Sequence, residues 1–178
     1  MRIIAGTARG TRLESPAGTS VRPTLDRVRE SLFNILGDSV QDIAFLDLFA
    51  GTGAVGIEAL SRGAERAVFV EHTVAHLELI QRNLTKAKLS DYARTVRCTV
   101  PQQLGVVGGS YEIVYADPPR SFVDYQTLST SIHEAGLLAE SGRFIIETPT
   151  GVQFDNDLGD LHLQDTRVYG DTRLTIFS

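Results

Sequence analysis

The sequence lacks the residues on which several classes of protein depend. Its 178 residues contain a single cysteine, Cys98, which excludes an internal disulfide and a cysteine-ligated zinc cluster. The four histidines are scattered, so we expect no metal site. No stretch approaches the roughly 18 apolar residues of a membrane-spanning helix, and residues 1–6 lack the apolar run of a signal peptide. We therefore expect a cytoplasmic protein with no membrane partner.

The overall composition is typical of a globular protein. Hydrophobic residues make up 42% of the chain and charged residues 22%. This length suits one compact core. We expect residues 1–38 to form an N-terminal arm packed on a core domain of residues 39–178, and we expect a monomer.

The net charge of −5 hides an asymmetry between the two ends of the chain. The first 30 residues carry six arginines against three acidic residues, whereas the remainder is acidic. Arginine suits bidentate phosphate contacts and stacking on bases, although the same charge also fits a solvated basic face. We predict RNA contacts from Arg9, Arg22, Arg27 and Arg29.

The arm is predicted to contain two short strands and one helix. Residues 2–14 read as a hairpin around Gly6 and Gly10. Thr24 is the expected N-cap of a helix that Gly37 ends, with an apolar stripe facing the core and its arginines facing solvent. The stripe comprises Leu25, Val28, Leu32, Ile35 and Leu36.

From residue 43 onward, buried strands alternate with helices. This alternation predicts an α/β fold, a Rossmann-like doubly wound and mostly parallel sheet, closed by a C-terminal antiparallel hairpin. Expected strands are 43–49, 67–71, 95–98, 111–116, 142–147, 161–169 and 172–177, and expected helices are 54–62, 74–87 and 125–135.

A glycine-rich loop joins the first predicted core strand to the next helix. Gly51, Gly53 and Gly56 have the G-x-G-x-x-G spacing, and Glu71 ends the following strand, 20 residues after Gly51. This pattern is typical of a dinucleotide site, in which the acid binds ribose hydroxyls. An NAD-dependent oxidoreductase is one interpretation.

Asp47 favours a different cofactor. It lies four residues before Gly51, where a carboxylate would repel a pyrophosphate. S-adenosylmethionine carries a sulfonium and an ammonium group instead, which carboxylates attract. We therefore predict S-adenosylmethionine at this loop.

A second motif, Asp117-Pro118-Pro119-Arg120, follows the predicted strand 111–116. The prolines have no N–H, so this segment offers mainly hydrogen-bond acceptors. Asp117 and the Pro118 carbonyl could accept both N–H bonds of an exocyclic amine, orient it and stabilise the charge that develops on nitrogen. We predict that these two residues are catalytic in methyl transfer to a flipped base.

Several segments together resemble the bacterial 16S rRNA guanine-N2 methyltransferases of the RsmD type. The resemblance spans nearly the whole chain and is strongest in 22–36 and in the glycine loop. The matching segments are 22–36 (RPTLDRVRESLFNIL), 46–53 (LDLFAGTG), 56–64 (GIEALSRGA), 117–119 (DPP) and 169–172 (YGDT).

This resemblance implies a substrate, a cofactor and roles for individual residues. The substrate would be one guanine of small-subunit rRNA, in an assembled or partly assembled small subunit, and the cofactor S-adenosylmethionine. The arm would lie near the RNA and the cofactor. We assign the cofactor to Thr24, Asp47, Phe49, Gly51, Gly53 and Glu71, and the substrate to Pro119 as well as the arginines.

Two positions depart from the family pattern. Arg120 stands where the family usually has an aromatic ring that stacks on the target base; its guanidinium, or the ring of Phe122 or Tyr125, is the candidate replacement. No acidic residue follows the strand 95–98, so Gln102 or Gln103 is the expected partner of the adenine amino group.

Other functions stay open at this point. The acceptor loop would also serve an amine methyltransferase that acts on DNA adenine or cytosine. Arg120 is also compatible with a poorly active ribosome-assembly factor that keeps the cofactor pocket.

Overall fold

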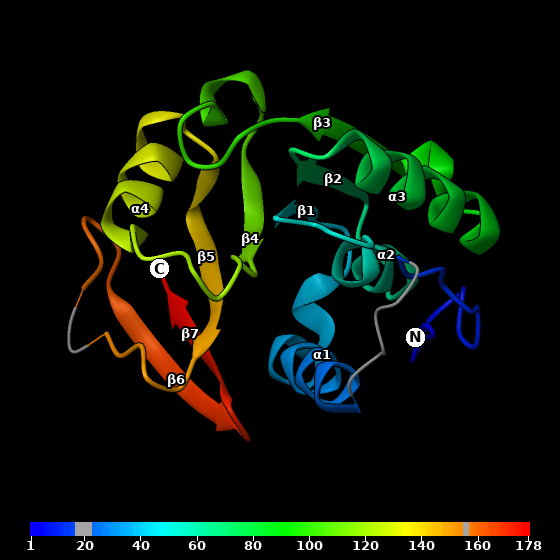
Figure 1. The fold of residues 1–178 in the computed structure, drawn as a ribbon, viewed down its shortest axis with the longest axis horizontal. Coiled ribbons are helices and arrows are strands. Elements are labelled where there is room, and N and C mark those ends of the chain that lie inside the picture. Colours follow the sequence, from blue (N-terminus) through cyan, green and yellow to red (C-terminus); the bar gives the residue numbers. More distant parts are fainter. Residues whose placement is uncertain (17–22, 155–156) are drawn as a thin grey trace.

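A computed structural model describes residues 1–16, 23–154 and 157–178. It contains one twisted seven-stranded sheet, shown in Figure 1, with the order β3-β2-β1-β4-β5-β7-β6. The strands are β1 (Ala44–Leu48), β2 (Arg66–Glu71), β3 (Ala93–Arg97), β4 (Tyr111–Ala116), β5 (Leu138–Pro149), β6 (Leu163–Tyr169) and β7 (Thr172–Phe177).

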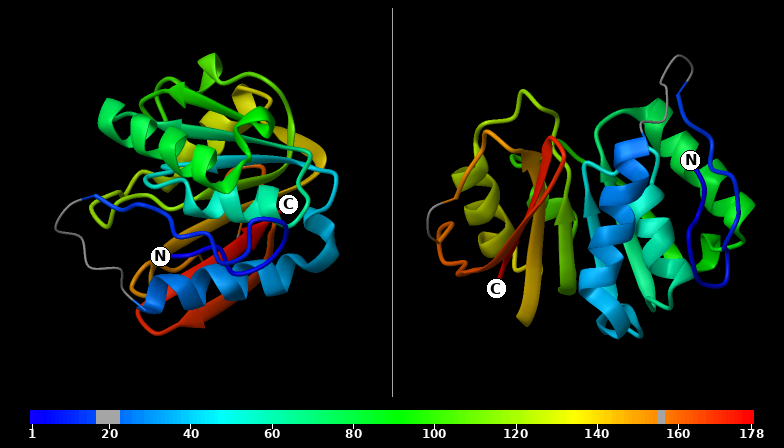
Figure 2. Two further views of the ribbon diagram at one scale, coloured as in Figure 1. Left: turned by 90° about the vertical axis from the view of Figure 1, so that its right-hand side faces the viewer. Right: turned by 90° about the horizontal axis from the view of Figure 1, so that it is seen from below.

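Helices cover both faces of this sheet. One face packs against α1, α2 and α3, and the other packs against α4, as the right-hand view of Figure 2 shows. The helices are α1 (Pro23–Leu36), α2 (Ala54–Ser61), α3 (Val74–Ala87) and α4 (Tyr125–Glu134), with short 3₁₀ turns at Gly37–Val40, Ser90–Tyr92 and Leu104–Val106.

The pairing of the strands confirms the predicted fold class. β1 pairs in parallel with β2 and β4, and β4 with β5, whereas β7 is antiparallel to both β5 and β6. The strand order reverses between β1 and β4. Doubly wound sheets bind their ligands at this switch point, outside the carboxyl ends of the strands.

Most predicted element boundaries agree with the structure within a few residues. The helix 74–87 and the strand 111–116 begin and end as predicted. β5 begins earlier, at Leu138, because an irregularity in its pairing with β4 adds residues at its start. The prediction for Thr24 as N-cap is wrong, since α1 already begins at Pro23.

The arm forms an irregular loop rather than the two predicted strands. In the described residues its two sides share one isolated bridge, between Arg2 and Arg12, and backbone hydrogen bonds such as those from Ile3 to Thr11 and from Leu13 to Met1. The arm is also held by α2: the Glu58 carboxylate accepts the backbone N–H groups of Ile4 and Ala5, at 2.9 and 3.0 Å. A buried side chain from another element thus adds to a pairing too short to form two strands.

None of the described helices is both long and apolar enough to span a membrane.

Candidate active site

Three carboxylates meet at the carboxyl edge of the sheet, on adjacent strands. Asp47 of β1 pairs in register with Tyr115 of β4, and Tyr115 pairs with Ile145 of β5. Asp117 and Glu147 lie two residues further along β4 and β5. Since side chains alternate between faces with a period of two, all three carboxylates belong to the face that α1 and α2 cover.

The loop after β1 adopts the unusual backbone that its glycines permit. Gly51 and Gly53 have φ values of +54° and +77°. Phe49 has φ +61°, a left-handed conformation that is costly for a bulky residue and that clusters at ligand sites. A Cβ on Gly56 would lie 2.4 Å from the Phe69 ring, so this glycine lets α2 approach the sheet.

Asp47 is buried beneath this loop. Its Oδ2 accepts the N–H of Gly56 at 2.9 Å. The pKa of Asp47 is raised to about 7. Burial is the main cause; the N–H of Gly56 acts against it, and the nearby charge of Glu71 acts with it. Asp47 therefore fixes the turn into α2 and also makes the site attractive to a cation.

Glu71 closes the loop from β2. Its Oε2 accepts the N–H of Gly51 at 3.1 Å, and its Oε1 accepts those of His72 and Thr73 at 2.9 and 3.0 Å. Burial alone would raise the pKa of Glu71, but these N–H donors and His76 hold it below the ordinary value. The group is therefore a fixed, ionised acceptor with a remaining lone pair on Oε2.

Asp117 stands where β4 ends, in a concave part of the surface that solvent reaches. The surrounding protein desolvates its carboxyl group and raises its pKa well above the ordinary value; Glu147 and Asp47 raise it further, and Arg120 lowers it. The Pro119 carbonyl accepts the N–H of Phe122 at 2.8 Å. Within the described chain no backbone donor reaches the Pro118 carbonyl, which stays available for a substrate.

Glu147 and Tyr115 form a buried pair beside Asp117. The Tyr115 hydroxyl donates to Oε2 of Glu147 at 2.6 Å, and Glu147 is only 8% exposed. Burial raises the pKa of Glu147, whereas Tyr115 and Arg120 lower it. Burial and the adjacent carboxylates raise the pKa of Tyr115 well above 10.

Two cavities meet at this edge, and Phe49, Gly51 and Asp117 line both of them. The first, of about 190 Å³, is the acidic cavity: its wall contains Asp47, Glu147 and Asp117 against one cationic side chain of the described residues, that of Arg29. Tyr115 also lines it. The second, of about 450 Å³, is largely apolar and is lined by Phe49, Gly51, Val70, Glu71, His72, His76, Cys98, Thr99, Val100, Asp117, Pro119 and Phe122.

The two cavities have the chemistry that S-adenosylmethionine requires. The larger, with apolar walls and the Glu71 acceptor at its edge, suits a nucleoside with ribose hydroxyls. The smaller suits a sulfonium and an ammonium group, because its three carboxylates outnumber the guanidinium of Arg29, which itself lies 3.6 Å from Glu58. Among the described residues, no three His, Cys, Asp or Glu side chains are arranged to hold a metal ion.

Arg120, at the position of the missing aromatic ring, lines neither of the two cavities. Its Nη2 lies 2.6 Å from the Asp171 carboxylate in the β6–β7 turn, and both side chains are exposed. Phe122 lines the apolar cavity instead and packs edge-on against Phe49, with ring centroids 5.5 Å apart. Tyr125 in turn packs edge-on against Phe122, with ring centroids 5.3 Å apart.

The predicted arginines do not form one exposed surface. Arg9 and Arg27 are exposed, in the arm and on α1. The expectation that Arg29 faces solvent is wrong: it is buried, 3.6 Å from Glu58, and its Nη2 donates to the Arg2 carbonyl at 2.7 Å. Arg22 lies outside the described residues, and of Thr24 only the backbone, in the first turn of α1, is described.

The structure does not bring Gln102 to the cavity. Gln102 is exposed and absent from the cavity wall, and the amide oxygen of Gln103 accepts the N–H of Thr99 at 2.9 Å. Thr99 and Val100 of the same segment do line the cavity.

Glu147 and Tyr115 were not predicted as site residues. Glu147 carries the signal that identified Asp47 and Glu71, a carboxylate at the end of a buried strand. Its contact with Asp117 depends on the pairing of β4 with β5, which the sequence pattern does not specify. Tyr115 reads as an ordinary strand residue.

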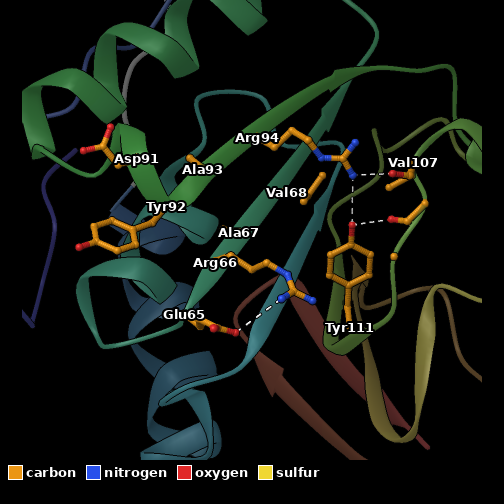
Figure 3. A pocket seen from close by; sticks show the side chains of 12 residues that line it. Glu65, Arg66, Ala67, Val68, Asp91, Tyr92, Ala93, Arg94, Val107 and Tyr111 are labelled. Atoms are coloured by element: carbon orange, nitrogen blue, oxygen red, sulfur yellow. Dashed lines mark hydrogen bonds and ion pairs between the residues drawn. The ribbon is translucent and has the colours of Figure 1, made fainter.

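A larger cavity, of about 780 Å³, lies at the opposite edge of the sheet (Figure 3). It is formed at the amino ends of β2, β3 and β4. Arg94 and Tyr111 point toward each other across it, and both bond to the loop between β3 and β4, at Val107 and Gly108. Parallel sheets bind ligands at the other edge, so this cavity is not the candidate site.

Comparisons with known proteins extend over the whole chain. A family model described as "Conserved hypothetical protein 95" matches residues 1–178. YlbH of Bacillus subtilis (strain 168) is 35% identical over 180 residues, which cover 99% of this chain and 98% of that protein.

Ribosomal RNA small subunit methyltransferase D of Escherichia coli (strain K12) is 38% identical over 149 residues, covering 83% of this chain and 74% of that enzyme. The solved structure of yhhF from Escherichia coli superimposes with a TM-score of 0.85 at 32% identity, covering 99% of this chain and 96% of that one.

Proposed function

The chain belongs to the family described as conserved hypothetical protein 95, and from this membership and the geometry of the site we propose a methyl transfer. The donor is S-adenosylmethionine, and the acceptor is the exocyclic N2 amine of a guanine in small-subunit ribosomal RNA. The name of the Escherichia coli relative supports this substrate. We infer that the protein acts as a cytoplasmic monomer on the RNA or on the assembled small subunit.

One observation carries the proposal: Asp117 lies in the wall shared by the acidic and the apolar cavity. A nucleoside in the apolar cavity and a cationic tail in the acidic one would meet beside it. This is also where Asp117 and the Pro118 carbonyl offer acceptors to an incoming amine.

The residues in the walls of the two cavities indicate which side chains would hold the cofactor. Glu71 would accept ribose hydroxyls, Phe49 and Phe122 would enclose the adenine, and Asp47 in the acidic cavity would face the charged end. When bound, S-adenosylmethionine supplies a methyl group on a sulfonium cation, which is open to attack by nitrogen.

The protein groups orient the nucleophile. The amine of guanine is a poor nucleophile because its lone pair is delocalised into the ring. Hydrogen bonds to Asp117 and Pro118 hold that amine in place, reduce the delocalisation and stabilise positive charge developing on nitrogen. Positioning and electrostatics thus take the place of a strong base, and the methylated amine would release its surplus proton to Asp117 or to solvent.

Labelled cofactor and small subunits from cells that lack this gene test the proposal. We expect the wild-type protein to label one guanine of the small-subunit RNA, and Asp117→Asn to lose at least about 100-fold in rate while still binding the cofactor by calorimetry. Asp91→Asn, an exposed carboxylate far from the site, is the matched control.

Single-stranded DNA of the same sequence separates the proposal from its nearest alternative. Labelling of DNA in preference to RNA would assign the protein to the DNA methyltransferases. The absence of label above a heat-inactivated control on either substrate would contradict methyl transfer itself.

A further inference from the structure

Glu147 is a buried carboxylate in the wall of the acidic cavity, and the methyl transfer outlined above gives it no role toward the substrate base. It lies beside Asp117, on the neighbouring strand. The carboxyl ends of adjacent parallel strands are about 4.8 Å apart, so the two side chains are spaced to contact neighbouring atoms of one ligand.

Only one oxygen of Glu147 is used within the described protein. Oε2 accepts the hydroxyl of Tyr115, and none of the side-chain hydrogen bonds found in residues 1–16, 23–154 and 157–178 involves Oε1. The bond from Tyr115 fixes the orientation of the carboxylate. Oε1 is therefore a fixed acceptor without a protein donor, next to the site of the reacting amine.

The bases differ in what lies beside their exocyclic amine. In guanine the amine at C2 is flanked by N1–H, a donor. In adenine and cytosine the neighbouring ring nitrogen has no hydrogen and presents a lone pair. A second carboxylate beside Asp117 would bind the first arrangement and repel the other two.

We propose that Glu147 selects guanine by accepting its N1–H on Oε1, while Asp117 holds the adjacent amine. This specificity role rests on the proposed methyl transfer and deepens it. Tyr115 is a positioning residue, because its hydroxyl determines which oxygen of Glu147 faces the base.

The test compares guanine with 2-aminopurine at the target position of the RNA, introduced by ligation and assembled into small subunits. 2-Aminopurine keeps the reactive amine but has a bare N1 and lacks O6, so the comparison is read together with Glu147→Gln, which changes the contact with N1 alone. We expect the wild-type protein to prefer guanine in kcat/KM by about 10- to 100-fold, the effect of one charge-assisted hydrogen bond. Equal rates on both bases would overturn the proposal, whatever the variants do.

Glu147→Gln gives the second measurement. The Tyr115 hydroxyl keeps the amide oxygen as its acceptor, so the amide NH₂ faces the base and donates to a bare N1. The preference for guanine should fall to about twofold or reverse, whereas Glu140→Gln, exposed on the same strand, should keep the wild-type preference.

The double variant Tyr115→Phe with Glu147→Gln separates this role from a structural one. Without the hydroxyl the amide can turn its oxygen to the base, and part of the guanine preference should return. An unchanged preference in Glu147→Gln, with normal cofactor binding by calorimetry, would contradict the role of Glu147. No labelling of guanine by the wild-type protein would instead contradict the proposed function.

Discussion

The Nε atom of Arg29 lies 3.6 Å from a carboxylate oxygen of Glu58, and the two side chains are only 4% and 0% exposed. Glu58 also accepts Nε of Arg62 at 2.8 Å and two N–H groups of the arm. One carboxylate thus joins α1, α2 and the first residues of the chain.

Glu58→Gln should destabilise the fold strongly. The substitution keeps the size of the side chain but removes the buried negative charge that faces both Arg29 and Arg62, and it leaves only one oxygen for the N–H groups of Ile4 and Ala5. Removing one partner of a buried ion pair costs about 3–5 kcal/mol of unfolding free energy. Urea unfolding measures it. Glu65→Gln, which removes an exposed pair with Arg66, should cost less than about 1 kcal/mol. A loss below that value for Glu58→Gln would contradict the anchoring role.

Arg9 and Arg27 should contact RNA phosphates. Both are exposed, and replacing either with alanine should lower the slope of log affinity against log salt by about one phosphate contact. Binding to small subunits at several salt concentrations gives that slope. Arg66→Ala, at the opposite edge of the sheet, is the control. Slopes equal to that of the wild type would show that Arg9 and Arg27 make no phosphate contact and are only solvated.

Stability should depend on pH through Asp47. Its pKa in the folded protein is about 7, above the ordinary 3.8, so the protonated form is the one that folding favours. The stability that this form contributes is present below the ordinary pKa and is lost as the pH rises through about 7.

Asp47→Asn removes that titration. Between pH 5 and pH 8 the variant should gain about 2–3 kcal/mol of unfolding free energy relative to the wild type, measured by urea unfolding. Asp91→Asn should show no such trend. A pH-independent difference for Asp47→Asn would indicate that Asp47 is ionised throughout this range.

Arg120 should influence the pH dependence of catalysis. Its charge lowers the pKa of both Asp117 and Glu147, so Arg120→Ala should raise these pKa values. Because Asp117 and Glu147 act as hydrogen-bond acceptors in the proposed reaction, the acidic limb of the pH–rate profile should move to higher pH. Arg167→Ala removes a comparable exposed pair, with Asp165, and should leave the profile unchanged.

The sequence predicted the sheet and most of the cofactor loop because those features are local. Asp47 and Glu71 lie at the carboxyl ends of buried strands, Gly51 follows the first of them, and the parallel fold brings such positions to one edge. The helix 74–87 has a regular apolar period, and its bounds were correct.

Arg29 and Glu147 could not be placed in the same way, because their environments come from distant elements. Arg29 follows the buried Val28 and reads as the polar flank of α1. It is buried because Glu58, 29 residues later, supplies the opposite charge. The position of Glu147 beside Asp117 depends on which strand lies next to β4. The partner of Arg120 comes from a turn 51 residues away.

The pairing of β4 with β5 is irregular at one end only. Between Tyr111 and Ile113 of β4, the partners on β5 advance from Leu138 to Arg143, and from there to Ile146 the register is regular. Changes in chain length before Arg143 therefore alter the size of this bulge and do not rotate Glu147 out of the cavity. The site is insulated from insertions and deletions at 139–142, which makes that segment a suitable place to graft a loop or a label.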